Sequence, residues 1–251
     1  MIQGIHNTAA AIEAMQRWND VIARNISAAS SPGYKKEVVS FEGVAAGIID
    51  RVQGEEGPEE IERIKPEVSG TVSTGVGQLR HTGDPMEFAI QGRGFFRLQR
   101  PDGQYVYTRD GQFHLSPSGE LLSKQGFPVM GENGTIQLLI DGGRPVIDTE
   151  GRIWQGDQEV GVLSVYDFND PRLLKRTTGG FVVDPETPQF PESVEFPNIQ
   201  QGYIEMSNVS PVREMVDLIA VSNALQANQK VIQSLDELTG RAVQVLGNTT
   251  A

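Results

Sequence analysis

The sequence lacks cysteine and has little positive charge for its length. Its 251 residues include 21 lysines and arginines against 33 aspartates and glutamates, so the formal net charge is −12. The missing cysteine excludes disulfides, iron–sulfur clusters, thiolate zinc sites and a cysteine nucleophile. The acidic balance argues against binding to nucleic acid or to an anionic membrane surface, because both need clustered lysine and arginine.

Long apolar runs are also missing. No stretch approaches the roughly 20 apolar residues that are needed to cross a bilayer, so we expect no membrane insertion. Residues 1–7 have neither the basic part nor the apolar part of a cleaved secretory signal. These two absences predict a cytoplasmic chain, unless a signal-independent route exports it.

Residues with recognisable chemistry are scarce. The three histidines stand at positions 6, 81 and 114, which is not the spacing of a zinc-binding helix. No nucleophile elbow or phosphate-binding loop is present. Several aspartates directly precede glycine, as Asp110 does, where turn formation is their usual role. We therefore expect no catalytic residue, no cofactor and no metal site. A carbohydrate-active enzyme that uses two carboxylates on a β core is the alternative of a different class.

Glycine and proline are concentrated in the middle of the chain. Of 28 glycines, 24 lie between Gly43 and Gly202, and 12 of the 14 prolines lie in the same interval. Because both residues interrupt helices and favour turns, this distribution predicts a helix at each end and a turn-rich centre.

Residues 5–29 have the apolar spacing of an amphipathic helix of the coiled-coil type. Pro32 and Gly33 follow and end the helix. The spacing alternates between three and four residues through a frame that consists of Ile5, Thr8, Ile12, Met15, Asn19, Ile22, Ile26 and Ala29.

The last forty residues repeat this pattern. Ser210 and Pro211 are a helix start signal, with a hydroxyl at the N-cap and proline at the first helical position. Gly247 ends the run, which predicts a helix from Pro211 to Leu246. Its frame consists of Leu218, Val221, Leu225, Asn228, Ile232, Leu235, Thr239, Ala242 and Leu246.

Each frame is interrupted by one asparagine, Asn19 in the first and Asn228 in the second. An asparagine at a core position of a coiled coil costs stability but fixes register and the number of partners. Alternatively, the frame is off by one residue and both asparagines face solvent.

The centre of the chain has the pattern of a β domain. Aromatic and β-branched runs, such as 95–99 and 104–109, alternate with Asp-Gly turns, which are hairpin signals. Later strands are expected at 160–167 and 180–183. Short strands with a turn every 8–12 residues favour a small sandwich or open barrel. The predicted fold class is α+β, in which the N- and C-terminal helices pair as a coiled coil and flank a central, mainly β domain.

Five segments follow from these patterns. The stretches 53–60 and 184–191 are expected to be exposed connectors because they are acidic or rich in proline. The segments are an N-terminal helix of the coiled-coil core at 1–31, an extended connector at 32–82, the central β domain at 83–190, a return connector at 191–209 and the C-terminal helix of the coiled-coil core at 210–251.

Several longer motifs resemble one protein family. Residues 21–35 resemble the N-terminal signature of the bacterial flagellar axial proteins, the rod and hook family, and 82–96 resemble its central signature. Residues 107–113 and 119–122 continue the central signature, and 207–212 resemble the link into the C-terminal helix. Two positions depart from the pattern: Ala28 stands where the family usually has asparagine, and Ser31 stands where it usually has threonine.

The resemblance implies a structural subunit without enzymatic activity. Such proteins leave the cell through the flagellar type III export apparatus without a cleaved signal, and they assemble in the periplasm into a hollow tube. Terminal helices form the inner layer and the β domain lies outside. The implied partners are further copies of the chain and neighbouring rod proteins in the basal body. The ending at 236–247 resembles proximal rod subunits, with a distal rod subunit as the alternative.

We expect the assembly interface on the apolar faces of the two terminal helices. A third interpretation is an adaptor that binds one partner through its coiled coil without polymerising. The residues expected at the interface are Ile5, Ile12, Met15, Asn19, Ile22, Asn25, Ile26, Leu218, Val221, Leu225, Asn228, Ile232, Leu235 and Leu246.

Overall fold

The computed structural model describes the backbone of residues 2–45 and 64–247. Side chains are described for residues 10–39 and 70–234, and for four positions of the last helix (237, 238, 240 and 241). The predicted connector at 53–60 lies outside the described residues. The chain divides into two compact units, which are called the helical unit and the β unit below. The helical unit comprises Met1–Ile26, Val38–Gly70 and Pro211–Ala251, and the β unit comprises Ser27–Glu37 and Thr71–Ser210.

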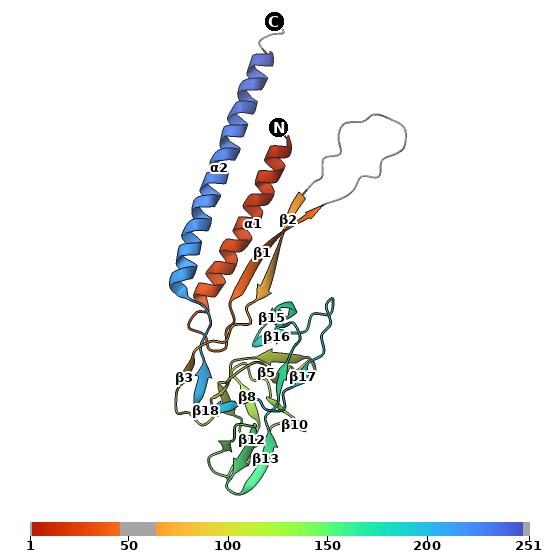
Figure 1. Ribbon diagram of the computed structural model, residues 1–251, viewed down its shortest axis with the longest axis vertical. Coiled ribbons are helices and arrows are strands. Elements are labelled where there is room, and N and C mark those ends of the chain that lie inside the picture. Colours follow the sequence, from red (N-terminus) through yellow and green to blue (C-terminus); the bar gives the residue numbers. More distant parts are fainter. Residues whose placement is uncertain (1, 46–63, 248–251) are drawn as a thin grey trace, which may run out of the picture. The chain divides into compact units, whose positions relative to one another are not determined.

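Two helices dominate the helical unit (Figure 1). Helix α1 spans Ile2–Ser27, and α2 spans Pro211–Gly247. Both predicted helices are therefore confirmed, and α2 begins at the proline that the sequence indicated. The two helices lie side by side in opposite directions, since the end of α1 contacts the start of α2. In the described part of the chain, neither helix has a segment apolar and long enough to span a membrane.

The centre of the chain is mainly β, so the predicted α+β class is confirmed. Its largest sheet has six strands in the order β15-β16-β6-β5-β14-β17, and all neighbouring strands in it are antiparallel. A three-stranded sheet, β11-β12-β13, and several two-stranded sheets accompany it. Strands β1 and β2 pair within the stretch that was expected to be an extended connector.

The strands are β1 (Glu37–Ala45), β2 (Ile64–Val72), β3 (Leu79–His81), β4 (Phe88–Ile90), β5 (Phe95–Gln99), β6 (Tyr105–Thr108), β7 (Phe113–Leu115), β8 (Leu121–Ser123), β9 (Met130–Gly131), β10 (Gly134–Thr135), β11 (Val146–Ile147), β12 (Arg152–Gln155), β13 (Gln158–Val162), β14 (Val165–Asp167), β15 (Lys175–Thr177), β16 (Gly180–Val182), β17 (Glu192–Ser193), β18 (Ile199–Gln201) and β19 (Tyr203–Glu205), with a short 3₁₀ helix, η1, at Pro171–Leu173.

The first predicted hairpin is present. Strands β5 and β6 pair antiparallel, and Gly103 in the turn between them has a φ of +84°, which suits glycine. The second Asp-Gly pair does not form a hairpin, because β7 pairs with β8 and not with β6. The chain bends at Gly111, where a side chain would meet the carbonyl oxygen of Phe88. The turn therefore directs the chain into a different sheet.

Apolar side chains cover both faces of the six-stranded sheet. Phe96 and Leu98 of β5 belong to the larger of two core clusters, and Phe95 belongs to the smaller one. Because successive side chains of a strand point to opposite faces, the two clusters lie on opposite sides of β5. This explains why Phe95 and Phe96 are both buried although they are adjacent in the sequence.

Candidate assembly surface and buried ionic cluster

The predicted interface residues of α1 are largely covered. Ile22 and Asn25 are buried, while Ile12, Met15, Asn19 and Ile26 are half-buried. The side chain of Ile5 lies outside the described residues. Two further α1 residues, Ala14 and Val21, are buried although they are not part of the predicted frame. The buried side of α1 is therefore centred about one residue earlier than the predicted frame.

The predicted residues of α2 share one side of the helix. Val221 is buried, and Leu218, Leu225, Asn228 and Ile232 are half-buried. The side chains of Leu235 and Leu246 lie outside the described residues.

Polar contacts join this side of α2 to α1. Asn25 Nδ2 donates to Glu214 Oε2 at 3.1 Å, and Asn228 Nδ2 donates to Met15 Sδ at 3.3 Å. Glu214 lies seven residues before Val221, so it belongs to the same side of α2. Glu214 is as buried as Asn25, and the sequence pattern gave no sign of it because a charged residue does not mark an apolar stripe.

The first two turns of α2 also have an apolar surface on the opposite side. Val212, Met215, Val216 and Ile219 are 51–74% exposed. Their spacing of three, four and seven residues places them on one side of a helix, about half a turn away from Glu214 and Val221. We call these four residues the outer stripe. An apolar stripe of this kind is typical of a surface that another protein covers.

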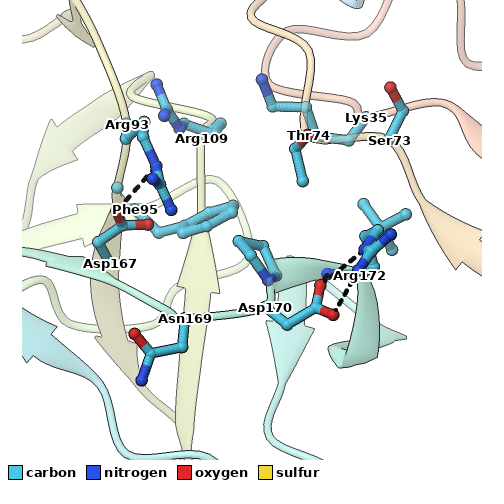
Figure 2. Close-up of a pocket in the computed structure, with 13 residues that line it drawn as sticks. Lys35, Ser73, Thr74, Arg93, Phe95, Arg109, Asp167, Asn169, Asp170 and Arg172 are labelled. Carbon is cyan, nitrogen blue, oxygen red and sulfur yellow. Dashed lines mark hydrogen bonds and ion pairs between the residues drawn. The ribbon is translucent and has the colours of Figure 1, made fainter.

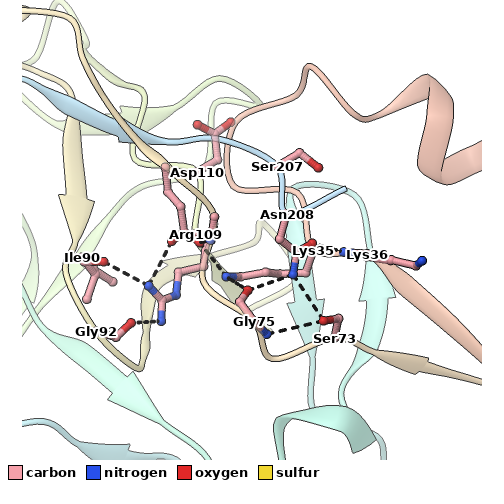
Figure 3. Close-up of polar contacts among 12 residues, drawn as sticks. Lys35, Lys36, Ser73, Gly75, Ile90, Gly92, Arg109, Asp110, Ser207 and Asn208 are labelled. Atoms are coloured by element: carbon pink, nitrogen blue, oxygen red, sulfur yellow. Dashed lines mark hydrogen bonds and ion pairs between the residues drawn. The ribbon is translucent and has the colours of Figure 1, made fainter. Parts of the chain in front are cut away.

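Three charged side chains form a buried cluster in the β unit, and two of them, Lys35 and Arg109, are labelled in Figure 3. Lys35 Nζ lies 2.6 Å from Glu205 Oε1, and Arg109 Nη1 lies 3.0 Å from Glu205 Oε2. All three side chains are at most 4% exposed. Lys35 follows α1, Arg109 follows β6, and Glu205 ends β19, so the cluster joins three distant parts of the chain.

Backbone groups complete this ionic cluster. Arg109 donates to the carbonyl oxygens of Ile90 and Gly92, and Lys35 donates to the carbonyl oxygen of Gly75. Glu205 Oε1 also accepts a hydrogen bond from Gly77 N at 2.7 Å. Such bonds are essential here, because a buried ion pair without them rarely offsets its own desolvation.

Burial has a direct effect on the two cations. It lowers the pKa of Lys35 and the pKa of Arg109, and in both cases the Glu205 carboxylate partly opposes this effect. Desolvation is the larger cause for both groups, because both cations are buried.

The ionic cluster is also the place where the family-like motifs meet. Lys35 comes from the motif at 21–35, Ile90 and Gly92 from 82–96, and Arg109 from 107–113. Asn208, from the motif at 207–212, accepts from Lys36 N and donates to the carbonyl oxygen of Gly75. The sequence motifs do not reveal this cluster, because Glu205 lies outside every motif.

Comparison with known proteins agrees with the resemblance. The model of the flagellar basal body rod FlgEFG protein C-terminal family matches residues 200–245, and the model of the flagellar hook protein FlgE/F/G D1 domain matches residues 89–154. The chain is 33% identical to the flagellar basal-body rod protein FlgF of Mesorhizobium japonicum, with 94% of each chain covered.

Other relatives carry the same kind of name. The FlgF protein of Salmonella typhimurium is 30% identical, with 90% of this chain and 91% of the relative covered. The flagellar basal-body rod protein FlgG of Borreliella burgdorferi is 28% identical, with 96% and 98% covered. The similarity extends over nearly the whole length of chains that are named as structural parts of one assembly. This chain therefore belongs to the family of flagellar basal-body rod proteins.

Proposed function

We propose that the chain polymerises through its terminal helices into the flagellar rod, with α1 and α2 packed as an antiparallel coiled coil. The observation that carries this proposal is the presence of two apolar sides on α2. The side with Leu218, Val221 and Leu225 is covered within the chain, whereas the outer stripe is exposed. A helix with apolar residues on two sides is stable in water only when both are covered.

In this arrangement the two sides of α2 have different tasks. The α1-facing side, with Asn25 and Asn228 making polar contacts across it, fixes how the two helices of one subunit pair. The outer stripe packs against helices of neighbouring subunits. Because a surface that binds a different surface of the next copy does not close on itself, repeated contacts of this kind produce a helical tube.

The names of the relatives support a proposal for the position in the rod. We assign the chain to the proximal rod, because a relative that is 33% identical over 94% of this chain is named FlgF. The distal rod is the alternative, since relatives named FlgG cover the chain equally well. Export through the flagellar type III apparatus without signal cleavage, and the absence of enzymatic activity, complete the proposal. A density map of isolated basal bodies that shows which rod layer contains this chain tests the position.

The polymerisation step is tested by substitution in the outer stripe. Ile219→Asp places a charge where a neighbouring subunit would pack, and Ile219 is 62% exposed, so the single subunit should still fold. We expect loss of swimming and loss of rods from basal-body preparations. The matched control is Gln229→Asp, at an exposed polar position of the same helix about a quarter turn away from Ile219. Normal rods with Ile219→Asp would overturn the proposal.

The α1-facing side is tested separately. Leu225→Asp or Ile232→Asp places a charge against α1 and should also abolish motility, but by separating the two helices of one subunit. Circular dichroism of the purified chain distinguishes the two cases, because helix content should fall with Leu225→Asp and remain with Ile219→Asp. The β unit should keep its fold in every variant, since it has its own core clusters.

A further inference from the structure

Beside the buried ionic cluster, the β unit contains a cavity of about 490 Å³. Its lining includes four cationic side chains, those of Lys35, Arg93, Arg109 and Arg172. Among the described residues, only two carboxylates line it, those of Asp167 and Asp170. Arg93 and Arg109 lie on one side of the space, and Lys35 lies on the other side with Ser73 and Thr74 (Figure 2). A positive surface of this kind is unexpected in a chain with a net charge of −12.

The charges around the cavity do not balance. Arg93 Nε pairs with Asp167 Oδ2 at 3.0 Å, and Arg172 Nη2 pairs with Asp170 Oδ2 at 2.8 Å, so each of these arginines has its own carboxylate. The buried Lys35 and Arg109 share Glu205, which lies behind the lining. The group as a whole therefore has one positive charge in excess, and that charge is held where water is largely excluded.

The cavity lining also has hydrogen-bond donors that are available to a ligand. An ammonium group has three protons, and Lys35 Nζ donates to two acceptors, the carbonyl oxygen of Gly75 and Glu205 Oε1. The Ser73 hydroxyl accepts from Gly75 N at 3.4 Å and from Asn208 Nδ2 at 3.3 Å, so its own proton can be given to a ligand. In the described part of the chain, the buried Nε of Arg109 has no acceptor.

We propose that this cavity binds a carboxylate. A single negative charge matches the single positive charge in excess, and it would face Lys35 at the inner end and the guanidinium groups of Arg93 and Arg172 at the mouth. These two arginines have side chains that are 71% and 64% exposed, so they can turn from their aspartates toward a ligand. Guanidinium groups bind carboxylates with favourable planar geometry. The carboxylate belongs either to a small free acid or to an acidic side chain of a second copy of the chain.

Sodium acetate is the probe, with sodium chloride at the same ionic strength as the reference. In the ¹⁵N spectrum of the full chain, acetate should give saturable shifts at the amides of Ser73, Thr74, Gly94 and Asp170. Equal responses to acetate and chloride would overturn the proposal.

Variants of the exposed arginines at the mouth of the cavity test the site without changing a buried residue. The combined change Arg93→Gln and Arg172→Gln should weaken acetate binding at least tenfold, because it removes two cations and leaves Asp167 and Asp170 unpaired. The matched control is Arg152→Gln, at an exposed arginine that pairs with Glu150 away from the cavity. Unchanged binding by the combined variant would contradict the assignment.

Sedimentation velocity separates the two sources of the carboxylate. If a side chain of a second copy occupies the cavity, saturating acetate should weaken self-association of the wild-type chain and of Arg152→Gln. If a free acid occupies it, acetate should bind without changing association. The site is thus tested by binding and the polymerisation proposal by the outer stripe, so one can fail without the other.

Discussion

Asn25 and Glu214 form a buried polar pair between α1 and α2. Asn25 Nδ2 lies 3.1 Å from Glu214 Oε2, and both residues are only 1% exposed. The two residues are 189 positions apart in the sequence, so this contact joins segments from opposite ends of the chain. A polar pair in an apolar seam restricts the alternatives for helix register, because any shift would break the hydrogen bond between them.

The first prediction concerns this pair. Asn25→Ala removes this hydrogen bond to a buried carboxylate and should destabilise the pairing of the two helices by about 1–3 kcal/mol, the usual range for a buried hydrogen bond to a charged group. Amide hydrogen exchange along both helices measures the effect as a loss of protection. Asn223→Ala, at an exposed position of α2, is the control. Equal exchange in the two variants would show that the pair contributes nothing.

The second prediction uses two glycines that share a backbone conformation but differ in their surroundings. Gly33 has a φ of +67°, and a Cβ there would lie 2.1 Å from Asp110 N. Gly103 has a φ of +84° with open space around it. Gly103→Ala should therefore cost about 1–2 kcal/mol, the conformational term alone.

Gly33→Ala adds a steric clash to that conformational cost. The amide of Gly33 donates to the carbonyl oxygen of Glu205 at 2.7 Å, so any backbone shift also disturbs the attachment of this segment near the ionic cluster. We expect a total loss in the free energy of unfolding clearly above that of Gly103→Ala, by about 2 kcal/mol or more. Urea unfolding of both variants provides the comparison, and similar losses would rule out the crowding at Gly33.

The elements that depend on local pattern were predictable from the sequence. Both helices were found from their apolar spacing, and Pro211 marked the start of α2. The hairpin at Gly103 was indicated by its turn residues. In each case the physical cause acts within a few residues of the chain, so a single sequence contains the information.

Features that depend on distant contacts were not predictable. Glu205 contacts Lys35, which is 170 positions away in the sequence, and Arg109, which is 96 positions away. The residues next to Glu205 in the sequence do not indicate either partner. The Asp110–Gly111 pair has the composition of a hairpin turn, yet Gly111 packs against Phe88 and the following strand, β7, pairs with β8 in a different sheet. The covered side of α1 is centred on Ala14 and Val21, about one residue earlier than the sequence pattern indicates, because burial depends on which distant segments pack against the helix.

The third prediction concerns a stacked arginine on the six-stranded sheet. The Cζ atom of Arg97 lies 4.2 Å from the ring centroid of Tyr166 and 4.7 Å from that of Tyr105. A planar guanidinium stacks on both rings, which a lysine ammonium cannot reproduce. Arg97→Lys should lower the free energy of unfolding of the β unit by about 0.5–2 kcal/mol. Arg152→Lys, whose side chain pairs with Glu150 at the surface, should have little effect in the same urea experiment.

The fourth prediction concerns alkaline pH and Tyr107, which is 3% exposed and lies edge-on to Phe168 with 4.8 Å between ring centroids. Burial raises the pKa of Tyr107 to about 12 from its ordinary value of 10.0. Between these two pH values the folded chain binds more protons at this site than the unfolded chain does. The contribution of the protonated Tyr107 phenol to the free energy of unfolding is therefore complete below pH 10 and is lost as the pH rises toward 12.

Tyr107→Phe isolates this contribution because it keeps the ring and removes the titrating phenol. From pH 9 to pH 11.5, the wild-type chain should lose about 1–2 kcal/mol more of its unfolding free energy than Tyr107→Phe does. Urea unfolding at the two pH values measures the difference, and other groups that titrate in this range cancel between the two proteins. Parallel losses would mean that Tyr107 ionises as readily in the folded chain as in the unfolded one.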